Sequence, residues 1–154
     1  MEQKTICIDF DGVIHDYNKG WQGEDVFGQM IPNADIGTAT LKKNGWTIII
    51  FTTRKKTGKL EKWLEENNIS YDHINENPNQ PEHASGKIIA DVYLDDRGIC
   101  FRGRWDSWLM RDIIEFEPWQ EQQKREIEQL ATYGQTEDDI WSRGNEKRIK
   151  QAHV

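Results

Sequence analysis

Short apolar runs alternate along the chain with segments of helical character. Residues 5–10 and 46–51 are continuous apolar runs, the pattern of strands buried on both faces of a parallel sheet. Residues 33–44 predict a helix, because Pro32-Asn33 opens the segment and Asn44-Gly45 ends it. Residues 57–67 predict another, with Leu60, Trp63 and Leu64 on one face and a threonine cap. Three further elements are expected: strands over 71–74 and 91–94 and a helix over 106–116 that buries Leu109, Ile113 and Phe116.

This alternation of strands and helices predicts an α/β layer fold with a mainly parallel sheet. In such sheets ligands bind beyond the carboxyl ends of the strands. Polar residues gather at three of these predicted ends: Asp9, Asp11, Thr52, Asp95 and Asp96. We therefore expect a functional site at this edge of the sheet.

The two acidic pairs are the strongest chemical signal. Asp9 and Asp11, two positions apart at a strand end, point to the same side of the strand. Like charges so close repel each other, which favours a cation between them. A second pair, Asp95 and Asp96, ends another apolar run.

Composition limits the classes of protein that fit. The chain has 154 residues, enough for one buried core, and its net charge of −7 gives no sign of nucleic-acid binding. Its apolar runs are too short to span a membrane, and no signal-peptide core follows Met1. Cys7 and Cys100 lack metal-type spacing, so we expect reduced thiols in a cytoplasmic protein with no membrane partner.

Residues 119–154 differ from the rest. They are charged, with a sparse apolar face, and we expect a helical C-terminal extension to a core formed by residues 1–118. Three roles stay open for the extension: an arm for homo-oligomer formation, a helix packed on the core, or a tail.

Taken in order, the acidic pairs and the residues between them resemble the four motifs of the haloacid dehalogenase (HAD) superfamily. The matching segments are Asp9-Phe10-Asp11-Gly12-Val13, Ile50-Phe51-Thr52, Lys87 and Leu94-Asp95-Asp96, and the resemblance covers residues 5–117. The chain further resembles small HAD-like proteins of bacteriophages and bacteria, through Asp9 to His15, Gly20 to Gly23, Asp95 to Ile99 and Phe116 to Trp119. The resemblance implies a three-layer Rossmann-like core, and the short inter-motif segments leave no room for a large cap domain.

The resemblance also implies a chemistry: Mg²⁺-dependent hydrolysis of phosphoric monoesters. Asp9 is then the nucleophile that forms an aspartyl-phosphate, and Asp11 transfers the proton with a pKa raised by its anionic neighbours. Thr52 holds a phosphoryl oxygen and Lys87 balances charge. The expected metal ligands are Asp9, Asp11 (through its backbone carbonyl), Asp95 and Asp96. The carboxylate at Asp11 favours phosphatases over dehalogenases within the family.

Several residues near the motifs are candidates for substrate binding. Gly12, Trp21, Thr53 and Arg54 are expected to bind it, although Arg54 equally fits pairing with a nearby carboxylate. Aromatic residues of the segment after the first strand either stack on a base or pack internally. We expect a small phosphorylated molecule such as a nucleotide. The alternatives are a polynucleotide 3′-end phosphatase, which the acidic net charge disfavours, and a non-catalytic HAD-fold binding protein.

Overall fold

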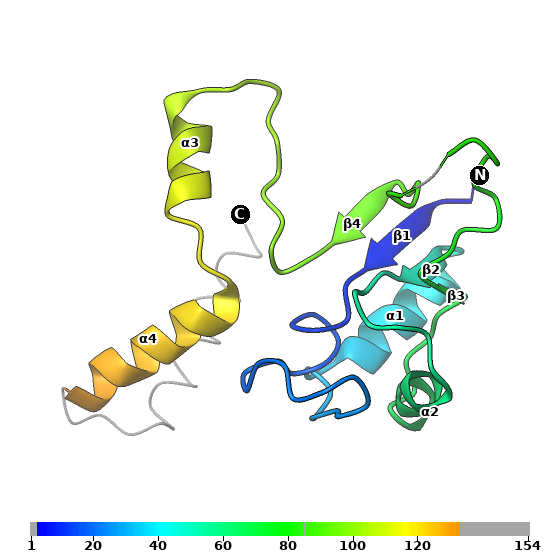
Figure 1. The fold of residues 1–154 in the computed structure, drawn as a ribbon, viewed down its shortest axis with the longest axis horizontal. Coiled ribbons are helices and arrows are strands. Elements are labelled where there is room, and N and C mark those ends of the chain that lie inside the picture. Colours follow the sequence, from blue (N-terminus) through cyan, green and yellow to red (C-terminus); the bar gives the residue numbers. More distant parts are fainter. Residues whose placement is uncertain (1–2, 85, 133–154) are drawn as a thin grey trace. The chain divides into compact units, whose positions relative to one another are not determined.

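The computed structural model describes residues 3–84 and 86–132, and the chain divides into two compact units, 1–100 and 101–154. The first unit has α/β architecture with an all-parallel, four-stranded sheet, as predicted (Figure 1). Its elements are β1 (Thr5–Ile8), α1 (Ala34–Lys43), β2 (Thr47–Ile50), α2 (Gly58–Glu66), β3 (His73–Ile74) and β4 (Val92–Leu94).

The strand order is β3-β2-β1-β4, so β1 lies inside the sheet between two parallel neighbours. Ile8 of β1 is in register with Ile50 of β2 on one side and Leu94 of β4 on the other. The carboxyl ends of these three strands therefore lie at the same edge. The chain leaves them at Asp9, Phe51 and Asp95, close to where the sequence predicts a site.

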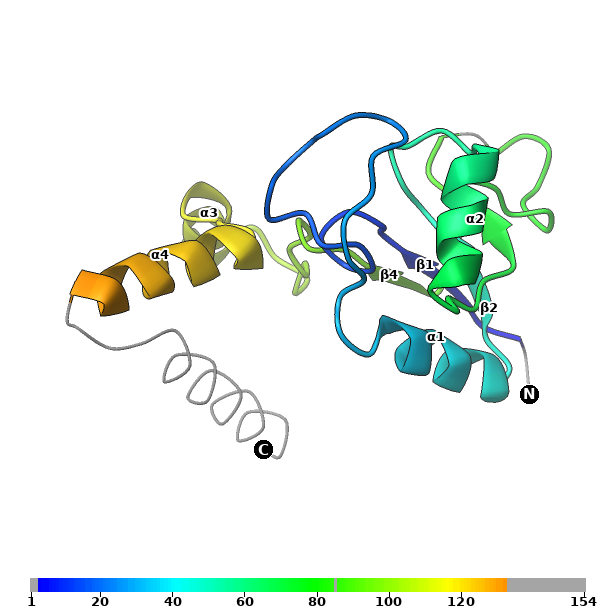
Figure 2. The ribbon, with the colours of Figure 1, turned by 90° about the horizontal axis from the view of Figure 1, so that it is seen from below.

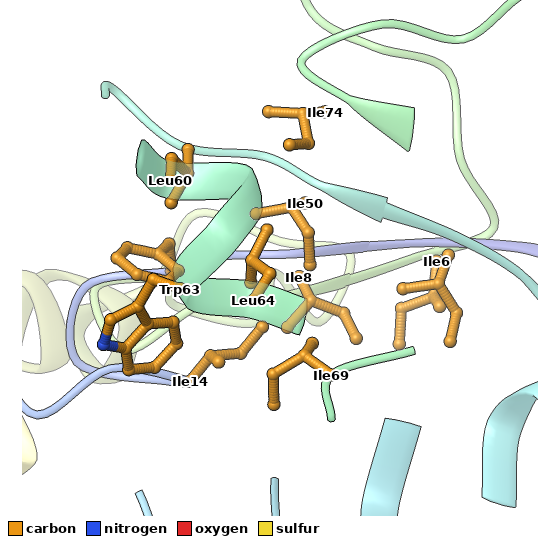
Figure 3. Packing of buried hydrophobic residues seen from close by; sticks show 11 residues of the cluster. Ile6, Ile8, Ile14, Ile50, Leu60, Trp63, Leu64, Ile69 and Ile74 are labelled. Carbon is orange, nitrogen blue, oxygen red and sulfur yellow. The ribbon is translucent and has the colours of Figure 1, made fainter. Parts of the chain in front are cut away.

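The two faces of the sheet bury alternate residues of β1 and β2. Ile6 and Ile8 of β1, with Ile48 and Ile50 of β2, pack on one face against α2, whose side chains point toward them in Figure 3. Helix α1 contacts this same cluster, so both helices cover one face (Figure 2). On the other face Cys7, Ile49 and Ile88 form a second, smaller cluster. Burial on both faces explains why the strands are continuous apolar runs.

The helices begin and end where local chemistry predicts. The Thr57 hydroxyl accepts a hydrogen bond from the Leu60 N–H at 3.2 Å and caps α2. Asn33 stands before α1 with φ 68°, and Asn44 ends it. These polar residues supply partners or turn geometry for helix termini that would otherwise leave backbone groups unpaired.

Strand β4 pairs only with β1 and forms an edge of the sheet. Its three side chains, Val92, Tyr93 and Leu94, are all exposed. They contrast with the side chains of β1 and β2, most of which are fully buried.

The segment between β1 and α1 contains no helix and no strand, only isolated bridges that join Asp11 to His15 and His15 to Met30. Residues 15–30 form a loop, here called the flap. A loop of this size, without a helix or strand, agrees with the expectation of a minimal cap. No helix in the described part of the chain is both long and apolar enough to cross a membrane.

The second unit contains α3 (Ser107–Ile114) and α4 (Trp119–Thr132). The unit begins at Phe101, before α3, whereas the sequence placed the boundary after residue 118. The predicted burial of the α3 face is wrong: Leu109 is half-buried, and Ile113 and Phe116 are exposed. No close backbone packing joins α3 to α4 in the described residues, so α4 does not cover that face. The predicted extension lies partly beyond residue 132, outside the described residues.

Candidate functional site

Three carboxylates converge at the carboxyl edge of the sheet. Asp9 follows β1, and Asp95 and Asp96 follow the neighbouring strand β4; one oxygen from each lies within 4.8 Å of the others. The Asp9 N–H donates to the Leu94 carbonyl at 2.9 Å, which extends the β1–β4 pairing and holds the two strand ends together. We call Asp9, Asp95 and Asp96 the acidic cluster.

The surroundings of Asp9 raise its pKa strongly. Burial, followed by the charges of Asp95, Asp96 and Asp11, raises the pKa of Asp9 to about 7. The one opposing contact is the Phe10 N–H, which donates to Asp9 Oδ1 at 2.7 Å. The ionised form of Asp9 is therefore disfavoured, and a bound cation would stabilise it.

A cavity of about 520 Å³ adjoins two members of the acidic cluster, Asp9 and Asp95. Lys87 lines the same cavity, with its ammonium 4.3 Å from the centre of the Tyr93 ring. The Tyr93 hydroxyl donates to the Ile88 carbonyl, which fixes the ring beneath the lysine. The fold thus brings Lys87, which lies far from Asp9 in the sequence, to the cavity of the acidic cluster.

The donor set of the acidic cluster suits Mg²⁺, the ion that the resemblance implies. Mg²⁺ prefers hard oxygen ligands and keeps several waters, and these three side chains offer only carboxylate oxygens. The cluster is half-buried at Asp9 and Asp96 and exposed at Asp95, so its outer side is open to water. Asp9, Asp95 and Asp96 are thus the residues that fit this ion.

Asp11 lies outside this cluster, and its surroundings correct one expectation. Burial raises its pKa, but hydrogen bonds and charge from His15 and Arg54 outweigh that effect and lower the pKa of Asp11 below its usual range. The expected raised value is wrong because two basic side chains contact this carboxylate, whereas the expectation considered only its anionic neighbours. Its side chain does not join the three convergent carboxylates. Its backbone carbonyl as a metal ligand stays a prediction.

Arg54 is the closest partner of Asp11. Its Nε and Nη2 donate to the two carboxylate oxygens at 2.8 and 2.9 Å, a bidentate ion pair whose arginine side chain is 1% exposed. His15 Nδ1 lies 2.8 Å from Asp11 Oδ1. Of the two roles left open for Arg54, the structure therefore supports the carboxylate partner rather than a free anion-binding side chain. We call Asp11, His15 and Arg54 the Asp11 group.

The other predicted residues lie at the ends of β1 and β2. The Thr52 hydroxyl accepts a hydrogen bond from the Arg54 N–H at 3.1 Å, which shapes the turn after β2. Thr53 is exposed. Gly12 has φ 90°, a conformation that favours glycine, and its N–H donates to the His15 carbonyl at 2.8 Å. Trp21 of the flap lies over the Arg54 guanidinium, with a ring centre 4.6 Å away.

Sequence reasoning missed Asn75. Its side-chain oxygen accepts from the Thr52 N–H at 2.8 Å and its amide donates to the Arg54 carbonyl at 3.0 Å. This one side chain, just after β3, braces the turn that positions Arg54. Its only sequence signal was an asparagine at the end of a short apolar run. The structure gives it φ 55°, which asparagine tolerates better than most residues.

No protein-family model matches the chain, and no curated protein matches it. A solved structure of a conserved protein from Bacteroides thetaiotaomicron is similar to it, with a TM-score of 0.51 and 23% sequence identity. The match covers 74% of this chain and 91% of that chain. At this identity the likeness supports the fold alone, and it agrees with the α/β class predicted from the sequence.

Proposed function

We propose that the chain is a Mg²⁺-dependent phosphoric monoester hydrolase of the HAD type that works through an aspartyl-phosphate on Asp9. The observation that carries the proposal is the acidic cluster at the ends of adjacent parallel strands, with Lys87 lining the same cavity. A pair or trio of acids alone is common on protein surfaces. A trio with a raised pKa at the predicted nucleophile, together with a lysine in the same cavity, is a more specific arrangement.

Bound at the cluster, Mg²⁺ would supply the positive charge that lets an anionic nucleophile approach an anionic phosphoryl group. An Asp9 oxygen attacks phosphorus, and the bond between phosphorus and the leaving oxygen breaks. Asp11 in its protonated form gives that oxygen a proton. Water then attacks phosphorus, the bond to Asp9 breaks, and ionised Asp11 takes a proton from the water. Lys87 offsets the charge of the phosphoryl group.

The substrate class that fits best is a small phosphorylated molecule such as a nucleotide. The cavity of about 520 Å³ lies within the range of small-molecule sites. Free thiols at Cys7 and Cys100 favour a cytoplasmic setting for this activity.

The test is hydrolysis of an aryl phosphate and a panel of phosphoesters by the full chain, with and without Mg²⁺. Wild-type protein should need the metal, and Asp9→Asn should lower kcat at least about 10³-fold, because the nucleophile is lost. Asp112→Asn is the matched control, since it removes an exposed carboxylate on α3. A folded, Mg²⁺-loaded protein that hydrolyses no member of the panel would contradict the proposal, as would equal loss in both variants.

A further inference from the structure

The flap and the proton-transferring carboxylate share the same buried contacts. We propose that Arg54 and His15 are positioning residues that couple the flap to Asp11, so that lifting the flap releases this carboxylate and closing it fixes the carboxylate in place. This inference rests on the proposed function only for the role of Asp11; the coupling itself rests on contacts.

Arg54 links the two directly. Two of its nitrogens hold the Asp11 carboxylate, and its Nη1 donates to the flap carbonyls of Gly23 and Glu24 at 3.1 and 2.8 Å. A guanidinium has five N–H donors in a rigid plane. Here two hydrogen bonds go to Asp11 and two go to the flap, so one rigid group holds both. If the flap moves, Arg54 therefore loses its hydrogen bonds either to the flap carbonyls or to the Asp11 carboxylate.

His15 makes the second link, and its tautomer follows from geometry. The Gly28 backbone N–H lies 2.6 Å from Nε2, and a backbone N–H can only donate, so Nε2 is the acceptor. The hydrogen therefore sits on Nδ1 and is donated to Asp11 Oδ1 at 2.8 Å. One imidazole ring therefore joins the flap backbone to the carboxylate.

Flap side chains also shield the ion pair. Trp21 and Phe27 place their ring centres 4.6 and 5.1 Å from the Arg54 guanidinium, and Phe10 of the core lies on it at 5.6 Å. Water exclusion strengthens the ion pair, so removal of these rings weakens it. A cavity of about 420 Å³ is lined by His15, Arg54 and residues of the flap.

The coupling bears on where the Asp11 carboxylate is held. Three hydrogen bonds from Arg54 and His15 fix its two oxygens, so these residues act on the reaction through the position of Asp11, without contacting substrate.

Hydrogen exchange of the flap peptides tests the coupling without any activity. Arg54→Lys keeps the charge but loses the planar fork, and amides of residues 15–30 should exchange at least about fivefold faster than in wild type. His15→Phe keeps an aromatic ring stacked on Phe10 and removes both hydrogen bonds of the histidine. It should speed the exchange of the flap amides by the same factor. This variant replaces Arg54→Lys as the test if Arg54→Lys does not fold. Lys59→Ala removes an exposed flap ion pair, to Asp25 at 3.2 Å, and should leave exchange unchanged.

Kinetics on the aryl phosphate then separate positioning from substrate binding. Arg54→Lys should lower kcat about tenfold or more with little change in KM, and should cause no further loss in an Asp11→Asn background. A rise in KM that persists in that background would overturn the inference, because Arg54 would then contact substrate. Flap exchange that matches wild type in both variants overturns it too. An inactive wild type whose flap still responds to Arg54→Lys overturns the proposed function but supports the coupling.

Discussion

Asp9 and Asp11 stand two positions apart in the chain, yet their surroundings differ completely. Asp9 faces two other carboxylates, and its pKa is raised to about 7, with burial as the leading cause. Asp11 faces an arginine and a histidine, and its pKa is lowered. The difference comes from which distant segment reaches each side chain: β4 supplies acids to one, while the turn after β2 supplies a base to the other. Charge state at this site is therefore set by topology rather than by the local sequence.

The largest effect that separates the two carboxylates should be on stability. Asp11→Asn leaves the buried Arg54 guanidinium without its counter-charge, so the free energy of unfolding should fall by about 3 kcal/mol. Urea denaturation at pH 7 measures this change. The aromatic rings around Arg54 keep the loss from being larger. A change below about 1 kcal/mol would show that the ion pair is not buried in solution.

For Mg²⁺ affinity, the substitution of Asp9 should have the larger effect and that of Asp11 the smaller one. Asp9→Asn removes one carboxylate of the acidic cluster and should weaken Mg²⁺ binding by about 100-fold, whereas Asp11→Asn should change it by less than about threefold. Calorimetric titration of Mg²⁺ into each folded variant is the measurement. Equal losses in the two variants would place Asp11 in the metal site and remove the contrast drawn between them.

The pH dependence of stability is a third property that should distinguish Asp9 from Asp11. The pKa of Asp9 rises from an ordinary 3.8 to about 7 on folding, so its contribution to stability is fully present below pH 3.8 and is lost as the pH rises through about 7. Without metal, Asp9→Asn should therefore stabilise the protein at pH 8, by about 1 kcal/mol after allowance for partial exposure, and have little effect near pH 4. Thermal unfolding with a chelator at both pH values tests the sign.

Addition of Mg²⁺ at pH 8 should reverse that order. Wild-type protein gains stability by binding the ion, and Asp9→Asn gains less. A variant that stays more stable than wild type at saturating Mg²⁺ would mean that Asp9 does not take part in metal binding.

The smallest effect concerns the exposed flap contact. Lys59→Ala removes an ion pair to Asp25 that lies in water, and it should lower the free energy of unfolding by no more than about 0.5 kcal/mol. Denaturation in low and high salt would detect it. Comparison with Asp11→Asn then contrasts an exposed flap contact with the buried one.

The sequence predicted the first unit well because its signals are local or periodic. The buried strands are apolar runs, and Thr57 marks the start of α2 with a cap that depends on residues three positions away. The edge carrying Asp9, Asp95 and Asp96 followed from parallel topology alone. These features need no knowledge of side-chain partners.

The Asp11 group lay beyond such reasoning. The pairing of Asp11 with Arg54 spans 43 positions, and nothing in either segment specifies the partner of a charged side chain. Asn75, which braces the turn before Arg54, is likewise defined by a contact 23 positions away. The α3 face was predicted to be buried because its apolar spacing is helical, but spacing shows which residues share a face and not what covers it.

The position of β4 has a consequence for folding. The Thr5 N–H donates to the Asp91 side chain across 86 positions of chain, so the β1–β4 pair closes a long loop. Contacts of such high sequence separation slow folding. During synthesis β1 is made first. Its edge that pairs with β4 stays unpaired until β4, which Asp95 and Asp96 follow, has been made. The three carboxylates therefore meet only when the sheet is complete, and Mg²⁺ binding would report the last strand docking rather than the collapse of the core.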